Sequence, residues 1–121
     1  VCMEGYRFEQ LDVWKLARSF VKVIYAVTKD FPDNERFDLT SQLRRASIST
    51  MLNIAEGSDR KSDKEFIRFL RIAYTSMQEV IAGCYVALDQ GYMSKERFDF
   101  VYTNSHIVGK KINALIKYLN K

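Results

Sequence analysis

The sequence has little proline, glycine, cysteine and histidine, and each shortage excludes a class of protein. One Pro and five Gly among 121 residues favour long helices, because proline removes a backbone donor and clashes inside a helix. The two cysteines, Cys2 and Cys84, and the single histidine, His106, have no metal-ligand spacing, so we expect no metal. A glycine-rich phosphate loop and a nucleophile beside a base are also missing. We therefore expect neither a cofactor nor a small-molecule substrate, and no enzymatic activity.

Long apolar runs are missing as well. No run approaches the ~20 residues that span a bilayer, and nothing resembles a secretory signal, so we expect a cytoplasmic protein. Hydrophobic residues make up 47% of the chain and charged residues 28%, which is typical of an ordered globular protein. The length predicts one domain, residues 1–121. The net charge of +4 permits an anionic partner without requiring one.

Apolar residues recur every three or four positions along most of the chain, which indicates amphipathic helices. The predicted helices cover residues 8–29, 37–56, 63–90 and 95–120. Ser62 and Glu65 form a capping-box pattern at the start of the third helix, and Ser94 caps the fourth. We expect Gly57 and Gly91 just past the ends of the second and third helices. Short loops and heptad-like stripes together predict an all-α, up-down-up-down antiparallel four-helix bundle.

The second helix differs from the other three. Its best apolar line becomes smaller and more polar along its length and consists of Leu39, Leu43, Ala46, Thr50, Asn53 and Gly57. Small residues let a neighbouring helix approach closely. An unmatched buried amide costs about 1–3 kcal/mol, so an asparagine on a core-facing line needs a hydrogen bond. We predict that Asn53 sets the register between helices, as single buried polar residues do in coiled coils.

The segment Asn-Ile-Ala-Glu-Gly at residues 53–57 places an acid among small and apolar residues. If Glu56 is partly buried, it needs a cation or a hydrogen-bond donor. Its candidate partners are Arg45, Arg60, Tyr74 and Gln78. We favour a structural role for Asn53, Glu56 and Gly57, because the sequence shows no second group with a matched catalytic role.

Basic residues surround this segment. From Arg36 to Arg71 there are eight Lys or Arg against five Asp or Glu, an excess that can neutralise phosphates. The candidate nucleic-acid-binding residues are Arg44, Arg45, Arg60, Lys61, Lys64, Arg68 and Arg71. We predict that the turn after residue 57 brings them to one surface, where binding is directed at the backbone. The alternative is an ordinary solvated face.

Five segments occur in an order and at spacings that resemble a known family. They are FEQLDVWKLA from Phe8, FP followed by Glu35, LTSQLRRASIS from Leu39, NIAEG from Asn53 and SDKEFIRFLRIA from Ser62. Across about residues 8–119, the chain resembles the four-helix proteins encoded in intervening sequences of bacterial 23S rRNA genes. The resemblance implies a left-handed up-and-down bundle and a ring-shaped homopentamer. Similar bundles are accessory proteins of diversity-generating retroelements, where they bind a reverse transcriptase and nucleic acid.

The chain departs from the family pattern at two places. Residues 49–52 read Ser-Thr-Met-Leu where relatives often have Ser-Ile-Pro-Ser, so a mid-helix proline kink is absent. Thr75 and Ser76 replace a frequent Gly-Ser pair, and we expect the packing of the third helix to differ there. The resemblance implies an oligomer that binds RNA, DNA or a reverse-transcriptase-like protein. The alternative is a structural or protein-interaction module without a nucleic-acid role.

Overall fold

The computed structural model describes residues 5–121, so Cys2 lies outside the described part of the chain. Its helices are η1 (Arg7–Gln10), α1 (Asp12–Thr28), η2 (Asp33–Glu35), α2 (Leu39–Ser58), α3 (Asp63–Asp89) and α4 (Lys95–Leu119). Only η1 and η2 are short 3-10 turns. Residues 5–121 contain no strand, which confirms the predicted all-α class.

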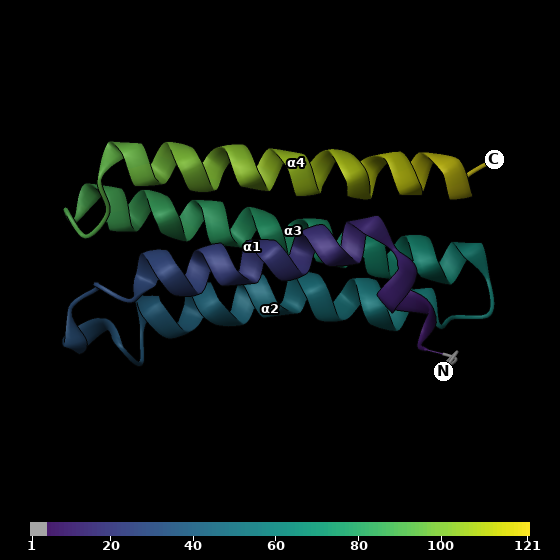
Figure 1. Cartoon of the computed structure of the whole chain (residues 1–121), viewed down its shortest axis with the longest axis horizontal. Coiled ribbons are helices and arrows are strands. Elements are labelled where there is room, and N and C mark those ends of the chain that lie inside the picture. Colours follow the sequence, from purple (N-terminus) through teal and green to yellow (C-terminus); the bar gives the residue numbers. More distant parts are fainter. Residues whose placement is uncertain (1–4) are drawn as a thin grey trace.

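The long helices run alternately up and down (Figure 1). Helix α1 packs against α2 and α4, and α3 packs against the same two helices. The diagonal pairs, α1 with α3 and α2 with α4, do not pack against each other. The first turn, η1, and the C-terminal end of α4 both lie at the end of the bundle where α2 turns into α3 (Figure 1). The predicted up-down-up-down four-helix bundle is therefore confirmed.

Three predicted helix ends are confirmed. The Ser62 hydroxyl accepts a hydrogen bond from the Glu65 amide at 3.2 Å, and the Ser94 hydroxyl accepts one from the Arg97 amide at 3.1 Å. Gly91 follows α3 with a φ of +77°, a left-handed conformation that favours glycine. Local hydrogen bonding therefore fixes where α3 begins and where α4 begins.

The first long helix begins four residues later than predicted. Residues 7–10 form the single turn η1, and Leu11 is extended with a ψ of 124°, which separates this turn from α1. The Arg7 guanidinium donates to the Ser58 carbonyl at 2.9 Å and lies over the ring of Phe66. The turn is thus held against the end of α2 rather than continuing α1.

The core is aliphatic and aromatic, with a few small polar side chains from α2. Its largest fully buried apolar side chains are Phe20, Ile24, Leu43, Ile54, Leu70 and Ile112. Thr50 and Ser47 are also fully buried on α2, and Thr50 donates to the Ala46 carbonyl at 3.1 Å. Among the described residues, no buried side-chain polar atom lacks a hydrogen bond, so the polar groups in the core do not destabilise it.

Gly57 lies inside α2, and its predicted place just past the helix end is wrong. The helix continues to Ser58, and Asp59 is its C-terminal cap. A Cβ atom on Gly57 would lie 2.7 Å from the Cβ of Phe69 and 3.0 Å from the ring of Phe66. The glycine therefore permits close approach of two helices, which overrides its usual role as a helix terminator.

Helices α2 and α3 form the closest-packed pair in the bundle. Gly83 on α3 makes a second close approach, because a Cβ atom there would overlap the side chain of Leu43. Ala46 and Ala73 are buried on the same two helices. We call this contact the α2–α3 interface, and its small residues fulfil the expectation that the second helix would be approached closely.

Candidate nucleic-acid interface

Asn53 does not bond directly to another helix. Its side-chain amide donates to the Ser49 carbonyl at 2.8 Å and to the Ser49 hydroxyl at 3.1 Å. The Ser49 and Ser76 hydroxyl oxygens are 2.9 Å apart and share a hydrogen bond between α2 and α3. Asn53, which we predicted to set the register between helices, therefore reaches α3 only through Ser49, and Ser49 and Ser76 make the direct bridge. Ser76 keeps the serine of the frequent Gly-Ser pair, and only Thr75 departs from that pattern.

Glu56 is exposed, and of its candidate partners it pairs with Arg60. The two charged groups are 3.8 Å apart, and the Arg60 Nε also donates to the Glu56 carbonyl at 3.2 Å. An exposed pair of this kind contributes at most about 1 kcal/mol. Residues 53–57 therefore act through close packing and through a local ion pair at the end of α2.

Arg44 lies apart from most of the other predicted binding residues. Its Nε donates to the Thr28 hydroxyl at 2.9 Å, and its guanidinium lies 4.5 Å from the centre of the Tyr25 ring. Both partners belong to α1. Arg44 and Arg45 are also about 22–24 Å from Arg60 along α2, at 1.5 Å per residue. The prediction that Arg44 and Arg45 lie near Arg60 on one surface is therefore wrong.

The remaining five predicted residues gather around the α2–α3 turn and the first turns of α3. We call this set the basic end, and it consists of Arg60, Lys61, Lys64, Arg68 and Arg71. Within residues 5–121, Arg60 is the one member that forms an ion pair. The guanidinium groups of Arg60 and Arg68 lie 5.2 and 5.4 Å from the Phe69 ring centre. Lys61, Lys64, Arg68 and Arg71 are exposed, so their charges are available to an anion.

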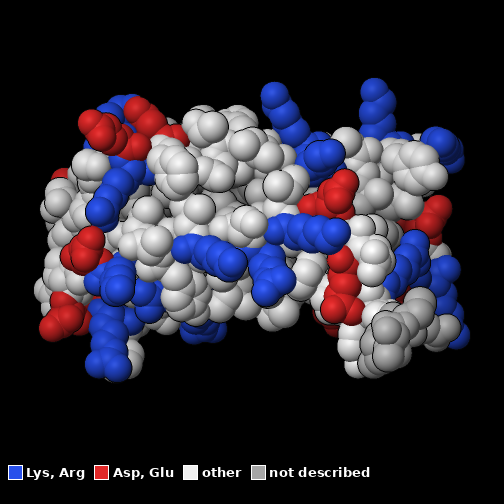
Figure 2. Space-filling model, viewed as in Figure 1, with Lys and Arg blue, Asp and Glu red and all other residues white. Residues whose placement is uncertain are grey.

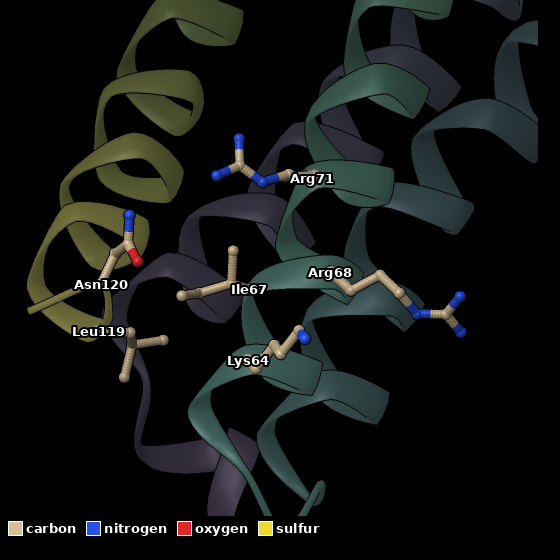
Figure 3. A pocket seen from close by; sticks show the side chains of 6 residues that line it. All are labelled: Lys64, Ile67, Arg68, Arg71, Leu119 and Asn120. Atoms are coloured by element: carbon tan, nitrogen blue, oxygen red, sulfur yellow. The ribbon is translucent and has the colours of Figure 1, made fainter.

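An open groove of about 600 Å³ adjoins the basic end, between the start of α3 and the end of α4. Ile67 and Leu119 form its apolar floor, with Asn120 beside them (Figure 3). Arg71 extends towards α4, whereas the guanidinium of Arg68 points away from α4 (Figure 3). The groove thus offers cations at its rim and aliphatic surface between them.

A second groove of about 470 Å³ lies further along the same two helices, and the sequence-based reasoning missed it. Its lining includes Tyr74 and Tyr85 from α3 and Tyr102, His106 and Lys110 from α4. The residues from each helix recur every three or four positions. Because the aromatic set is divided between two helices, no single stretch of sequence shows it.

Within residues 5–121, no acidic side chain lines either groove. Residues 66–78 of α3 and 100–121 contain six Lys or Arg and no Asp or Glu. Figure 2 shows Lys and Arg side chains rising from the C-terminal half of α4, at the upper right, while acidic side chains gather at its other end. The potential along this side of the bundle is therefore positive.

Other chemistry has little support in the described residues. Burial raises the pKa of the Cys84 thiol to about 12, so the thiol stays protonated at neutral pH and is a poor nucleophile. His106 is exposed and packs against Tyr102, with ring centres 4.8 Å apart. No cluster of three or more metal-ligating side chains occurs in residues 5–121. None of the described helices is long and apolar enough to cross a membrane.

Comparisons with known proteins agree with the four-helix fold. The family model described as 23S rRNA-intervening sequence protein matches residues 9–114. A crystal structure of a protein with unknown function from the S23 ribosomal protein family of Bacteroides thetaiotaomicron is similar, with a TM-score of 0.77 and 22% identity. The match covers 87% of this chain and 98% of that one, and at this identity it supports the fold alone. None of the curated proteins matches the chain.

Proposed function

Because the chain belongs to the 23S rRNA-intervening sequence protein family, we propose that it is a non-enzymatic oligomer that binds ribosomal RNA or DNA. The observation that carries the proposal is the basic end, where Lys61, Lys64, Arg68 and Arg71 are exposed without an ion pair in residues 5–121. We place this activity in the cytoplasm, where both nucleic acids are found.

Because the basic end neutralises phosphates, we expect the affinity for nucleic acid to fall as the salt concentration rises. Each cation that replaces a condensed counterion on duplex DNA contributes about −0.9 to the slope of log affinity against log salt. Four such cations in one copy therefore give a slope of about −3.6. The basic end has no sequence-reading module, so its contacts are directed at the backbone and discriminate weakly between sequences.

Oligomerisation strengthens this proposal. Large apolar side chains remain exposed on α3 and α4, among them Ile72, Val86, Phe100 and Ile107, and exposed apolar surface of this kind is available to another protein chain. The family resemblance implies a homopentamer. Five copies of the basic end raise the avidity for a long polyanion without any new contact within one copy.

The dependence of binding on salt concentration tests the proposal that the protein binds nucleic acid. The Arg68→Ala/Arg71→Ala variant is titrated with ribosomal RNA fragments, duplex DNA and single-stranded DNA across salt concentrations. We expect weaker binding, with a duplex-DNA slope reduced by about 1.8 for each copy that contacts the DNA. The Lys22→Ala/Lys29→Ala variant removes the same charge from an exposed position on α1 and from the exposed residue that follows it, and is the matched control. No binding by the unaltered protein at low salt contradicts the proposal, as does an equal loss in both variants.

Light scattering tests the assembly. We expect a particle about five times the 14.2 kDa mass of the chain, as a pentamer requires. A monomer contradicts the oligomeric part of the proposal and leaves the charge argument in place.

A protein-interaction module is the second candidate function, favoured by the exposed apolar residues of α4. Phe100 is 56% exposed and Ile107 is 47% exposed. In this case we expect the protein to bind a reverse-transcriptase-like partner after nuclease treatment. The Phe100→Ser/Ile107→Ser variant then loses the partner, whereas the Arg68→Ala/Arg71→Ala variant retains it.

A further inference from the structure

The two grooves between α3 and α4 follow one another along the bundle, and together they form what we call the α3–α4 groove. We propose that this groove binds single-stranded nucleic acid, with phosphates at the basic end and bases against its tyrosines. The inference rests on the proposed function, because it requires that the basic end attract nucleic acid. It adds the class of substrate and a set of residues that the charge argument does not contain.

The lining residues show that the two grooves are parts of one path. The first groove is lined by residues near the start of α3 and the end of α4. The second is lined by residues 74–85 of α3 and 102–113 of α4. This is the order that two antiparallel helices give to a single path. From Lys64 to Tyr85 the path is about 32 Å long, at 1.5 Å per residue.

The aromatic part of the path can receive bases. Tyr85 is 49% exposed and Tyr102 is 39% exposed, and the two come from opposite walls of the groove. The Tyr85 ring packs against the buried Phe98 ring, with ring centres 4.7 Å apart. The centres of the Phe98 and Tyr102 rings are 5.8 Å apart. The shared neighbour holds both rings in place while part of each remains open. Exposed aromatic rings beside cations are the usual platform for single-stranded nucleic acid.

The charges along the groove also favour single-stranded nucleic acid as its ligand. Lys110 lines the aromatic part of the path, and Arg71 reaches over the apolar floor at the other end (Figure 3). No acidic side chain of the described residues lines the path. A phosphate chain that runs along the groove therefore meets cations at the basic end and at Lys110, beside Tyr74.

A duplex cannot use this surface in the same way. Its bases are stacked inside and its outer surface presents phosphates and sugars, so it can contact the basic end but not the tyrosines. A single strand can turn unstacked bases outwards, onto aromatic rings or arginine planes. The apolar floor formed by Ile67 and Leu119 likewise binds a base more favourably than a phosphate. The preference for a single strand therefore comes from the groove, and general affinity comes from the charge.

Fluorescence anisotropy with a labelled oligonucleotide of about 16 nucleotides, at the upper end of known site sizes, tests the inference. The same sequence is measured as a single strand and as a duplex. In Tyr85→Leu/Tyr102→Leu we expect single-strand affinity to fall at least about fivefold for each tyrosine, with the salt slope unchanged. Duplex affinity stays as in the unaltered protein. Tyr25→Leu/Phe100→Leu changes two exposed aromatic residues outside the groove, and we expect it to retain single-strand binding.

Arg71 and Arg68 provide a second, independent comparison. Arg71→Gln is expected to lower the single-strand salt slope by about 0.7 for each bound groove, and Arg68→Gln to lower it less, since only Arg71 reaches towards α4 (Figure 3). Single-strand binding that is indifferent to both tyrosines overturns the inference and leaves the proposed function standing. Equal losses for duplex and single strand also overturn it. Failure of the unaltered protein to bind either form at low salt overturns both.

Discussion

On one side of α3, glycine and serine bring α2 into close contact, whereas on the other side tyrosine and methionine hold α4 less closely. At the α2–α3 interface, Gly57 and Gly83 leave no room for a Cβ atom. Along the α3–α4 groove, Tyr74 and Met77 line an open cavity beside Gly109. Small residues thus stabilise the fold on one side, while larger ones leave space for a ligand on the other. The same helix serves both purposes with different faces.

The largest expected loss of stability comes from a substitution at the α2–α3 interface. Gly57→Ala places a Cβ atom 2.7 Å from the Cβ of Phe69, which cannot move without its backbone. We expect a loss of about 2 kcal/mol in the free energy of unfolding, typical of overpacking, despite the higher helix propensity of alanine. Urea denaturation followed by circular dichroism measures it. Unchanged stability would show that α2 and α3 can separate at no cost.

A smaller loss is expected where a hydrogen bond joins the two helices. Ser76→Ala removes the buried partner of the Ser49 hydroxyl, and we expect a loss of about 1 kcal/mol. Combining Ser76→Ala with Ser49→Ala in a double-mutant cycle isolates the energy of the pair. Fully additive losses would mean that the two hydroxyls do not stabilise the interface through each other.

Asn53 provides a sharper contrast on the same helix. Asn53→Ala removes bonds that stay within α2 and introduces the residue with the highest helix propensity. We expect the free energy of unfolding to change by no more than about 0.5 kcal/mol. The same urea titration measures it. A loss as large as that for Ser76→Ala would restore Asn53 as the residue that sets the register.

The smallest effect is expected on the open side. Gly109→Ala places a Cβ atom 2.9 Å from the methyl group of Met77 and 3.2 Å from the Tyr74 ring. Both are ends of side chains that can move into the adjacent groove. We expect stability to stay the same or to rise by up to about 1 kcal/mol, the usual gain of alanine over glycine in a helix. A loss equal to that for Gly57→Ala would show that the two sides of α3 are equally tight.

The parts of the fold that local signals control were predictable from sequence. Apolar spacing gave the four helices, and Ser62, Ser94 and Gly91 act within a few residues of themselves. Gly57 was misread because a glycine near a helix end serves either as a terminator or as a point of close approach. The partner helix decides between these roles, and the partner is not visible in the local sequence.

Rotation about the helix axis explains why Asn53 and Arg44 on α2 are not placed as predicted. Successive residues point about 100° apart, at 3.6 residues per turn. Ile54 therefore occupies the core while Asn53 is half-buried beside it, although both fit an apolar line in the sequence. The same rotation directs Arg44 towards α1 and leaves the adjacent Arg45 exposed. The tyrosines of the α3–α4 groove were missed because neither helix alone contains the set.

The contact between Arg7 and Ser58 has a consequence for the order in which the protein folds during synthesis. The arginine leaves the ribosome early, and its carbonyl partner follows 51 residues later. The hairpin of α1 and α2 can therefore close while α3 is still inside the ribosomal exit tunnel, and this bond holds η1 against the end of α2. Phe66, which the same guanidinium also contacts, arrives next. A nascent chain that has just released Ser58 from the tunnel is thus the earliest species in which η1 has its native neighbour.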